Sequence, residues 1–278
     1  MENEFDVQYS AILREILATG ATEKNLRTGH ICRSLPGISM KFDLKKNFPI
    51  LTLRKIPLKV FIAEQIWFLT GKKNLEFLQK FTKIWDDFAE KNNCVQSAYG
   101  YRWRKHFGRD QILGVIELLQ KDPTSRHGVI LMWDAADDGL AGGTKKKNLP
   151  CPFSFTVQII GGKLCLHLII RSNDMLLGNP HDVAGFALLA HFFAEKLQVD
   201  PGILTVSISN AHIYGIHFSA AREICRRKIS HPPINFSCPK NAFDRALAGD
   251  ENLVAEIFEN LKKNYSPQPP LEKMKIVL

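Results

Sequence analysis

Two segments, 57–71 and 183–197, restrict the fold most, because each is predicted to be a helix that is apolar on nearly every face. In the first, PLKVFIAEQIWFLTG, apolar residues recur at helical spacing and a glycine ends the run. The second, VAGFALLAHFFAEKL, has the same character. Neither approaches the ~20 apolar residues that a membrane-spanning helix needs. We therefore expect both helices to be buried inside a globular fold.

Strand patterns dominate the middle of the chain. FSFTVQII (153–160) and LCLHLIIR (164–171) are separated by GGK, which predicts a β-hairpin. GVILMW (128–133) and ILTVSIS (203–209) indicate further strands. Helices interspersed with hairpin-linked strands favour an α+β fold, and we expect one domain over 1–278 with a large mixed sheet flanked by helices.

Composition indicates an ordinary globular protein. Hydrophobic residues make up 45% and charged residues 23% of the 278-residue chain. The acidic, polar start MENEFDVQYS is unlike a secretory signal, so we expect a cytoplasmic protein. Six scattered cysteines without a CxxC pair disfavour a disulfide framework and a structural zinc site, and we expect no metal.

The net charge of +9 favours anionic partners, either nucleic acid or a phosphorylated small molecule. The densest basic run, GGTKKKN at 142–148, is flanked by glycines and carries no interleaved aromatic residue. It indicates a solvated loop, so we expect neither a specific nucleic-acid site nor a membrane partner.

Two isolated residues have both a structural and a functional interpretation. Glu64 lies on the apolar helix 57–71, where a carboxylate is costly unless it is paired. It forms either a buried salt bridge or a carboxyl group of a functional site. Cys151 stands between two prolines directly before a strand, which predicts a fixed, irregular position. Taken alone, such a cysteine is more often a small buried hydrophobe than a catalytic thiol.

Basic and hydroxyl-bearing residues supply other candidates. Arg27, Arg126 and Arg171 each adjoin small or turn-forming residues, where a guanidinium is placed to bind phosphate, although any one of them suits a plain surface role. His212 and Tyr214, in NAHIYGIHF, project to one side if the preceding strand continues. They suit either sugar hydroxyls or a polar cluster in the core.

Asp182 directly precedes the apolar run 183–197. An aspartate at this place can cap a helix, because its carboxylate accepts from free backbone N–H groups. It can equally contact a ligand, and an asparagine would cap as well as an aspartate.

Taken together, the motifs of the chain resemble the thymidylate synthase family over nearly the whole length. The landmarks occur in the family's order. They are LRTG, AEQIWFLTG, IWDDFAEKN, YGYRWR, DPTSRHGVILMW, LPCPF, RSNDMLLGNPHD, NAHIYGIHF and a final YSPQPPLEKMKIVL. The resemblance is poor only between residue 235 and that last motif.

The resemblance implies an α+β homodimer whose sheets pack back to back, with an arginine shared across the interface. It implies a one-carbon transferase that uses 5,10-methylenetetrahydrofolate as co-substrate and a pyrimidine nucleoside monophosphate as substrate. Cys151 would be the nucleophile that adds to C6 of the base and so activates C5. Nearby arginines would lower the pKa of this thiol.

The same resemblance assigns the other site residues. Glu64 and Tyr99 match the groups that organise proton transfer around the base. His127 stands where the family usually has a second phosphate-binding arginine, and a neutral imidazole there would weaken the phosphate site. The nucleotide-binding residues would be Arg27, Arg171, Ser172, His212, Tyr214, His127 and Arg126, the last from the other subunit. The folate would be held by Trp85, Asp174 and Gly178.

Besides His127, three positions depart from the thymidylate synthase pattern. Pro152 follows the nucleophile where histidine or asparagine is common, and Phe88 replaces a frequent tryptophan. The largest departure is Asp182, where thymidylate synthases carry an asparagine that contacts O4 and N3–H of uracil. Cytosine has an amino donor at position 4 and an acceptor at N3, which suits a carboxylate that accepts from the amino group and shares a proton with N3.

An aspartate here, with RSND upstream, is typical of the cytidylate-directed branch of the family, exemplified by phage dCMP hydroxymethylases. We therefore interpret the chain as a dCMP hydroxymethylase, in the cytoplasm or in the host cytoplasm if phage-encoded. The alternatives are a dCMP or CMP C5-methyltransferase and then thymidylate synthase acting on dUMP. The sequence does not distinguish methyl from hydroxymethyl products, ribose from deoxyribose, or DNA modification from a natural-product pathway.

Two unrelated classes fit less well. A nucleic-acid-binding protein would gather its basic residues on one element, whereas these arginines are spread over separate motifs. A zinc cytidine deaminase needs a P-C-x-x-C motif, and PCPFSF lacks the second cysteine.

Overall fold

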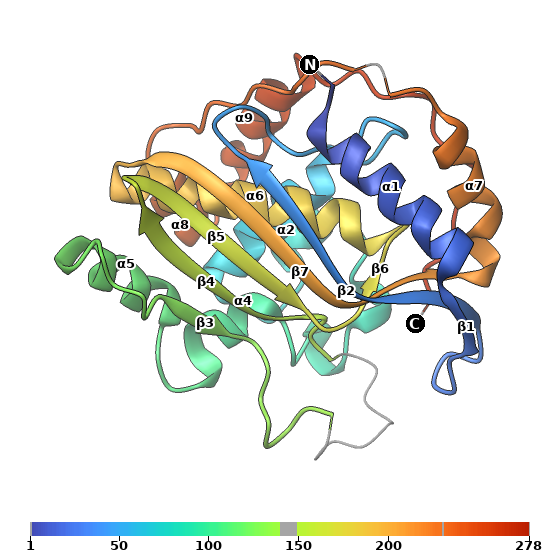
Figure 1. Cartoon of the computed structure of the whole chain (residues 1–278). Coiled ribbons are helices and arrows are strands. Elements are labelled where there is room, and N and C mark those ends of the chain that lie inside the picture. The colour runs from blue at the N-terminus through green and yellow to red at the C-terminus, as the bar shows by residue number, and fades with distance from the viewer. Residues whose placement is uncertain (1, 140–148, 230, 278) are drawn as a thin grey trace.

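The computed structural model describes residues 2–139, 149–229 and 231–277, and within them seven strands form one mixed sheet (Figure 1). From one edge to the other the path is β1 (Ala21–Lys24), β2 (Ile31–Asp43), β7 (Asp200–Tyr214), β5 (Lys163–Ile170), β4 (Pro152–Ile160) and β3 (Val129–Leu131), with β6 (Asn173–Asp174) paired to the end of β7. β7 runs parallel to β5 and β6, and the other pairings are antiparallel. The expected mixed sheet is confirmed.

The strands follow the sequence pattern with changed ends. The predicted hairpin is β4 and β5, joined at Gly161 and Gly162, whose φ values of +59° and +72° suit a tight turn without a side chain. The strand predicted at 203–209 is longer, because β7 continues to Tyr214 along β2. The strand predicted at 128–133 is shorter, since only three residues pair with β4.

Both predicted apolar helices are present and buried. α2 (Leu58–Thr70) packs against α6 (Gly178–Leu197), and α6 in turn packs on β5 and β7 (Figure 1). The remaining helices are α1 (Glu4–Thr19), α3 (Glu76–Gln79), α4 (Tyr99–Tyr101), α5 (Gln111–Lys121), α7 (Phe218–Arg226), α8 (Ala242–Ala248) and α9 (Glu251–Lys262). Short 3-10 or π turns are η1 (Asp86–Phe88), η2 (Lys91–Asn93), η3 (Arg102–His106) and η4 (Gly215–His217).

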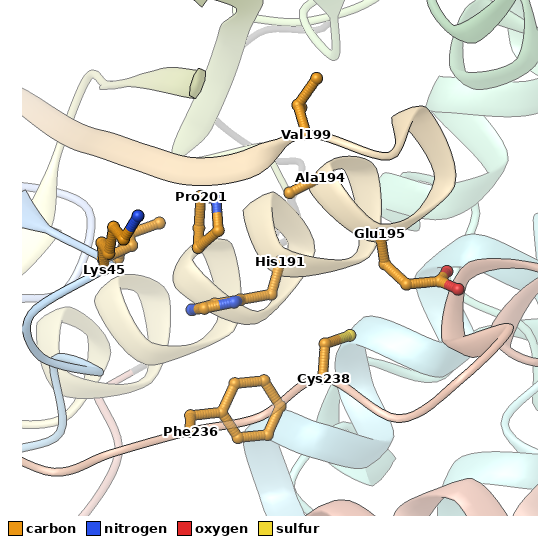
Figure 2. A pocket seen from close by; sticks show the side chains of 9 residues that line it. Lys45, His191, Ala194, Glu195, Val199, Pro201, Phe236 and Cys238 are labelled. Carbon is orange, nitrogen blue, oxygen red and sulfur yellow. The ribbon is translucent and has the colours of Figure 1, made fainter. Parts of the chain in front are cut away.

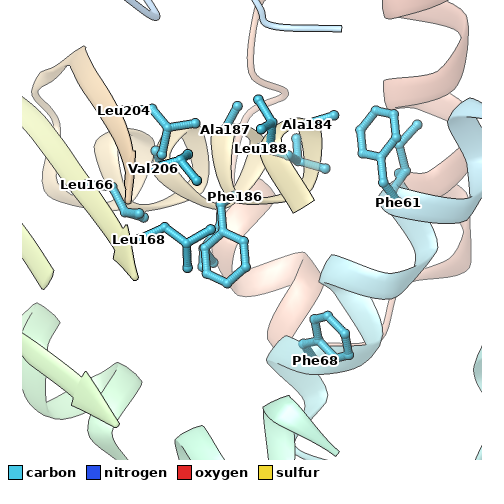
Figure 3. Close-up of a cluster of buried hydrophobic side chains, with 14 of the residues drawn as sticks. Phe61, Phe68, Leu166, Leu168, Ala184, Phe186, Ala187, Leu188, Leu204 and Val206 are labelled. Carbon is cyan, nitrogen blue, oxygen red and sulfur yellow. The ribbon is translucent and has the colours of Figure 1, made fainter. Parts of the chain in front are cut away.

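The core lies between the sheet and these two helices. Figure 3 shows leucines and valine of β5 and β7 facing small and apolar side chains of α6, with phenylalanines of α2 beyond them. Each large apolar side chain buried in this way contributes about 1.5–3 kcal/mol. The labelled members are Leu166, Leu168, Leu204, Val206, Ala184, Phe186, Ala187, Leu188, Phe61 and Phe68. α6 therefore needs an apolar surface on both sides, which explains its sequence.

The start of α6 differs from the sequence expectation. The helix begins at Gly178, and its N-cap, Leu177, makes no side-chain cap bond. Pro180 is tolerated because backbone N–H groups in the first turn have no intrahelical acceptor. Asp182 consequently lies one turn inside the helix, and of its two interpretations the one in which it caps a helix of 183–197 does not hold.

The opposite face of the sheet is only partly covered. Along β5 and β7, buried residues alternate with intermediate or exposed ones. The described part of the chain has no helix long and apolar enough to cross a membrane. All six cysteines are free. The basic run 142–148 lies outside the described residues.

Candidate active site

Cys151 lies where the chain enters β4. Its backbone N–H donates to the Tyr99 hydroxyl at 3.2 Å, and its carbonyl accepts from the Arg171 backbone N–H at 2.9 Å. The pairing of β4 with β5 shifts register between Pro152 and Ser154. The irregular, fixed position expected from the flanking prolines is therefore confirmed.

The Arg171 side chain holds the segment that carries the thiol. Its guanidinium donates to the carbonyls of Pro150 at 2.8 Å and Leu149 at 3.2 Å, and Nη2 lies 3.8 Å from Cys151 Sγ. Burial raises the pKa of the Cys151 thiol, and the charges of Arg171 and Arg27 offset this only in part. The expected lowering of this pKa by arginine is thus present but outweighed by burial.

Glu64 has a hydrogen-bond partner and no ion pair. The indole Nε1 of Trp85 donates to Glu64 Oε1 at 2.5 Å, and no salt bridge between described residues includes this carboxyl. Burial raises the pKa of Glu64 to about 7, with a further contribution from the charge of Asp182. The salt-bridge interpretation is not supported, and Glu64 is a carboxyl group that titrates near neutral pH.

An aromatic wall joins Glu64 to Cys151. The Trp85 ring lies 5.9 Å from Tyr99, 6.0 Å from Phe68 and 5.5 Å from Phe88, measured between centroids. Burial raises the pKa of the Tyr99 hydroxyl well above its ordinary value, so the group is a neutral phenol. The wall therefore presents flat apolar rings beside one hydroxyl and one carboxyl.

The end of β7 brings two further predicted residues together. The rings of His212 and Tyr214 lie 4.9 Å apart, which confirms that the strand continues and that both project to one side. Asp174 of β6 stands opposite His212, and its Oδ1 accepts from the backbone N–H groups of Leu176 and Leu177. Burial lowers the pKa of His212, which favours the neutral ring.

Asp182 faces this site from α6. Asn173 Nδ2 donates to Asp182 Oδ2 at 2.8 Å. Burial raises the pKa of Asp182 to about 7, against the opposing effect of the Asn173 hydrogen bond. A Cβ built on Gly178 would lie 3.4 Å from Asn173 Nδ2 and 3.7 Å from Asp182 Oδ2, which is ordinary van der Waals contact, so the start of α6 lies directly against this pair. Sequence reasoning missed Asn173, although it stands within the RSND motif.

The remaining predicted residues lie in two different parts of the chain, near the ends of the central strands and in the turn before β3. Arg27 is exposed in the turn between β1 and β2, and its charge lowers the pKa of both Cys151 and His212. Ser172 lies in the bend after β5 and is partly exposed. Arg126 and His127 are exposed in the turn between α5 and β3, and within the described part of one chain their side chains make no hydrogen bond to Cys151.

A separate cavity of about 370 Å³ lies along the second half of α6 (Figure 2). Its wall includes His191 and Phe236, whose rings are 4.9 Å apart, and its rim carries Lys45. No predicted site residue lines it. The predicted site residues therefore lie outside this cavity.

Comparison with known families agrees with this geometry. A family model described as thymidylate synthase matches residues 7–276, nearly the whole chain and including the segment after 235 that resembles the family poorly by eye. Members of this family are one-carbon transferases that modify C5 of a pyrimidine nucleotide with methylenetetrahydrofolate. The chain thus belongs to the thymidylate synthase family.

Proposed function

We propose that the protein is a dCMP hydroxymethylase, which transfers a one-carbon unit from 5,10-methylenetetrahydrofolate to C5 of a cytosine nucleotide. Asp182 is the single observation that carries this choice. Its carboxylate caps no helix, forms no ion pair among the described residues, and stands near Glu64, Tyr99 and Cys151.

The hydrogen-bonding edge of the base explains why this carboxylate favours cytosine. An ionised carboxylate only accepts hydrogen bonds, so it pairs with the 4-amino group of cytosine and opposes the O4 lone pairs of uracil. Sites built for one donor–acceptor pattern reject the other by orders of magnitude when the mismatch is buried. The remaining residues of the site are common to both substrates.

Cys151 is proposed as the nucleophile. The thiol loses its proton and Sγ forms a bond to C6, while the electron pair of the C5=C6 bond shifts through C5 and C4 to N3, which takes up a proton. C5 thereby becomes the nucleophilic carbon of an enamine. Arg171 favours the thiolate because its Nη2 lies 3.8 Å from Sγ. Glu64, with its pKa near 7, and the neutral Tyr99 hydroxyl are placed to accept and deliver protons around the base.

The residues proposed to hold the folate fit that group. Trp85 uses its N–H on Glu64, which leaves the ring face for stacking with a flat pterin. Asp174 Oδ1 accepts from two backbone amides, while Oδ2 accepts no hydrogen bond from the described residues. Gly178 adds no side chain between Asp174 and Asp182. When bound, the folate supplies the one-carbon unit.

The nucleotide phosphate and sugar would be held by residues from two subunits. Arg171 lies beside the thiol, with Ser172 next to it in the chain, and Arg27 acts on the thiol through its charge. His212 and Tyr214 are proposed to bind the sugar hydroxyl. We further propose a homodimer in which the partly covered face of the sheet is buried. Arg126, with His127, would then reach the site of the partner subunit.

Hydroxymethylation is preferred over methylation because an aspartate at position 182 is typical of that branch of the family. Methylation of dCMP or CMP is the second candidate and would use the same residues. Synthesis of thymidylate from dUMP is the third. We place the reaction in the cytoplasm, where folate and nucleotides are available.

The test is incubation of the protein with methylenetetrahydrofolate and dCMP, CMP or dUMP, followed by mass spectrometry of the nucleotide. We expect dCMP to gain CH2O. A gain of CH2 on dCMP would replace hydroxymethylation by methylation, and turnover of dUMP alone would contradict the proposed function.

A further inference from the structure

The two oxygens of the Asp182 carboxyl group have different surroundings. Oδ2 accepts a hydrogen bond from Asn173 Nδ2 at 2.8 Å, whereas no described residue donates to Oδ1. Asp182 is partly exposed, while Asn173 is only 2% exposed. One oxygen is therefore tied to the protein, and the other is available to a ligand.

Asn173 is itself fixed in orientation. It lies on β6, paired with Ala211 of β7, and its Oδ1 accepts from Asn179 Nδ2 at 2.8 Å. Asn179 is fully buried in the first turn of α6. Because Asn179 donates to the amide oxygen of Asn173, the Asn173 NH2 group is directed at Asp182.

This hydrogen-bond arrangement determines whether Oδ1 of Asp182 accepts or donates a hydrogen bond at the base. A donor on Oδ2 stabilises the ionised carboxylate, and if the group is protonated the proton is kept on Oδ1. Ionised Oδ1 accepts from a 4-amino group, whereas protonated Oδ1 donates to a 4-oxo group. The hydrogen bond from Asn173 thus links the charge of Asp182 to the choice between cytosine and uracil.

We propose that Asn173 is a positioning residue for base specificity: by holding Oδ2, it directs Oδ1 of Asp182 at position 4 of the pyrimidine and favours cytosine. This inference rests on the proposed function, since it takes Asp182 as the group that contacts the base. Asn173 itself touches no substrate. An asparagine at position 182 would obey the same constraint, because Asn173 would hold its amide oxygen and turn its NH2 toward the base.

Other titratable groups interact with Asp182, and their protonation also affects a measurement made as a function of pH. They come from different elements and each interacts with Asp182 through its charge. They are Glu64 of α2, Tyr99 of α4, Cys151 before β4 and Asp174 of β6. Glu64 titrates in the same range as Asp182, so the experiment includes a Glu64→Gln background.

The experiment measures dissociation constants of dUMP and dCMP between about pH 6 and about pH 9. We use the dissociation constant of dUMP divided by that of dCMP, because titration of the phosphate affects both nucleotides equally. In the unmodified protein we expect this ratio to rise with pH, with a midpoint at about 7, the pKa of Asp182.

Asn173→Asp is the main variant, because it keeps the shape and the acceptor for Asn179 but replaces the donor to Asp182 by a second carboxyl. We expect the midpoint to move to higher pH and the ratio at neutral pH to fall about tenfold, as for a lost hydrogen bond to a charged group. Asn173→Ala, which removes the donor without adding charge, should move the midpoint in the same direction. Both shifts should persist with Glu64→Gln.

Asn47→Asp is the matched control. Asn47 is also a buried amide, bonded to Ile234 and Asn3 far along the chain from Asp182. We expect it to lower thermal stability without moving the midpoint. Folded Asn173 variants with an unchanged midpoint and ratio would overturn the role of Asn173 alone. An unmodified protein that binds dUMP more tightly at every pH would overturn the proposed function and this inference with it.

Discussion

At the scale of single residues, the site is defined by two largely buried carboxyl groups, Glu64 and Asp182, that interact. Burial raises the pKa of both Glu64 and Asp182 to about 7, and each has one neutral hydrogen-bond donor, Trp85 or Asn173, instead of a cation. Such groups lower the stability of the fold when they are ionised, and they are retained where proton transfer or recognition needs them.

Glu64→Gln should change how stability depends on pH. The folded-state pKa of Glu64, about 7, is above its ordinary value of 4.5, so the stability it contributes is present at low pH and lost as pH rises through 7. The variant should therefore gain Tm over the unmodified protein at about pH 8 but not at about pH 5, by roughly 2 °C or more. Glu117→Gln, an exposed position on α5, is the control and should show no such difference. An equal effect at both pH values would argue against a buried carboxyl.

Cys151→Ser should abolish turnover while leaving the site intact. A serine hydroxyl is a far weaker nucleophile, and loss of a catalytic nucleophile costs at least about a thousandfold in rate. Nucleotide binding should change little, which calorimetry can measure. Cys94→Ser, outside the site, should keep full activity. Substantial turnover by Cys151→Ser would exclude a covalent mechanism.

The sequence predicted individual residues of the site better than their partners. Cys151, Arg171, Tyr99, Glu64 and Asp182 were expected together from ordered motifs, and the structure brings them together. Hydrogen bonds such as the one from Asn173 to Asp182 were not predicted. They depend on how β6 meets α6, which no local pattern encodes.

At the scale of elements, the contact between α2 and α4 fixes the aromatic wall. A Cβ built on Gly100 would lie 1.9 Å from the carbonyl oxygen of Phe68, so the two backbones touch. This approach sets the Tyr99 ring 5.2 Å from Phe68 and its hydroxyl against Cys151. Glycine at position 100 is therefore required by packing.

Gly100→Ala should destabilise the protein by more than about 3 kcal/mol or prevent folding, because backbone at the contact must move. Thermal denaturation measures this effect. Gly108→Ala is the matched control. It has open space around it and a φ of +70°, so it should cost only about 1 kcal/mol of conformational strain. Equal, small losses for the two variants would show that the contact is not rigid.

Element positions were predicted well and element ends poorly. Hydrophobic periodicity located α2, α6 and the β4–β5 hairpin. The start of α6 was misplaced because GNPH contains residues typical of turns, although proline is acceptable in a first helical turn. The long strand β2 (Ile31–Asp43) was missed, since it contains Pro36 and Gly37.

At the scale of the whole molecule, we propose that the site is shared between two subunits. Arg126 and His127 are exposed in the turn before β3, and one face of the sheet is only partly covered. The net charge predicted an anionic partner. The motifs predicted the family, and the match of the thymidylate synthase family model to residues 7–276 confirms the family. Subunit arrangement could not be derived from one chain.

Mixing two inactive variants tests the shared site. Arg126→Ala and Cys151→Ser should each be inactive as homodimers, but a heterodimer has one site with both intact residues. Random exchange at equal concentrations makes half of the dimers mixed, so about one quarter of the activity should return. Failure to regain activity after verified exchange would contradict an arginine shared between subunits.

The central claim is that Asp182 selects the base, and a competition assay tests it most directly. Equal amounts of dCMP and dUMP are incubated together with methylenetetrahydrofolate, and both products are quantified by mass spectrometry. The unmodified protein should convert dCMP with a preference of about a hundredfold or more, and Asp182→Asn should reverse the preference toward dUMP. Equal preferences in the two proteins, or conversion of dUMP first by the unmodified protein, would contradict the claim.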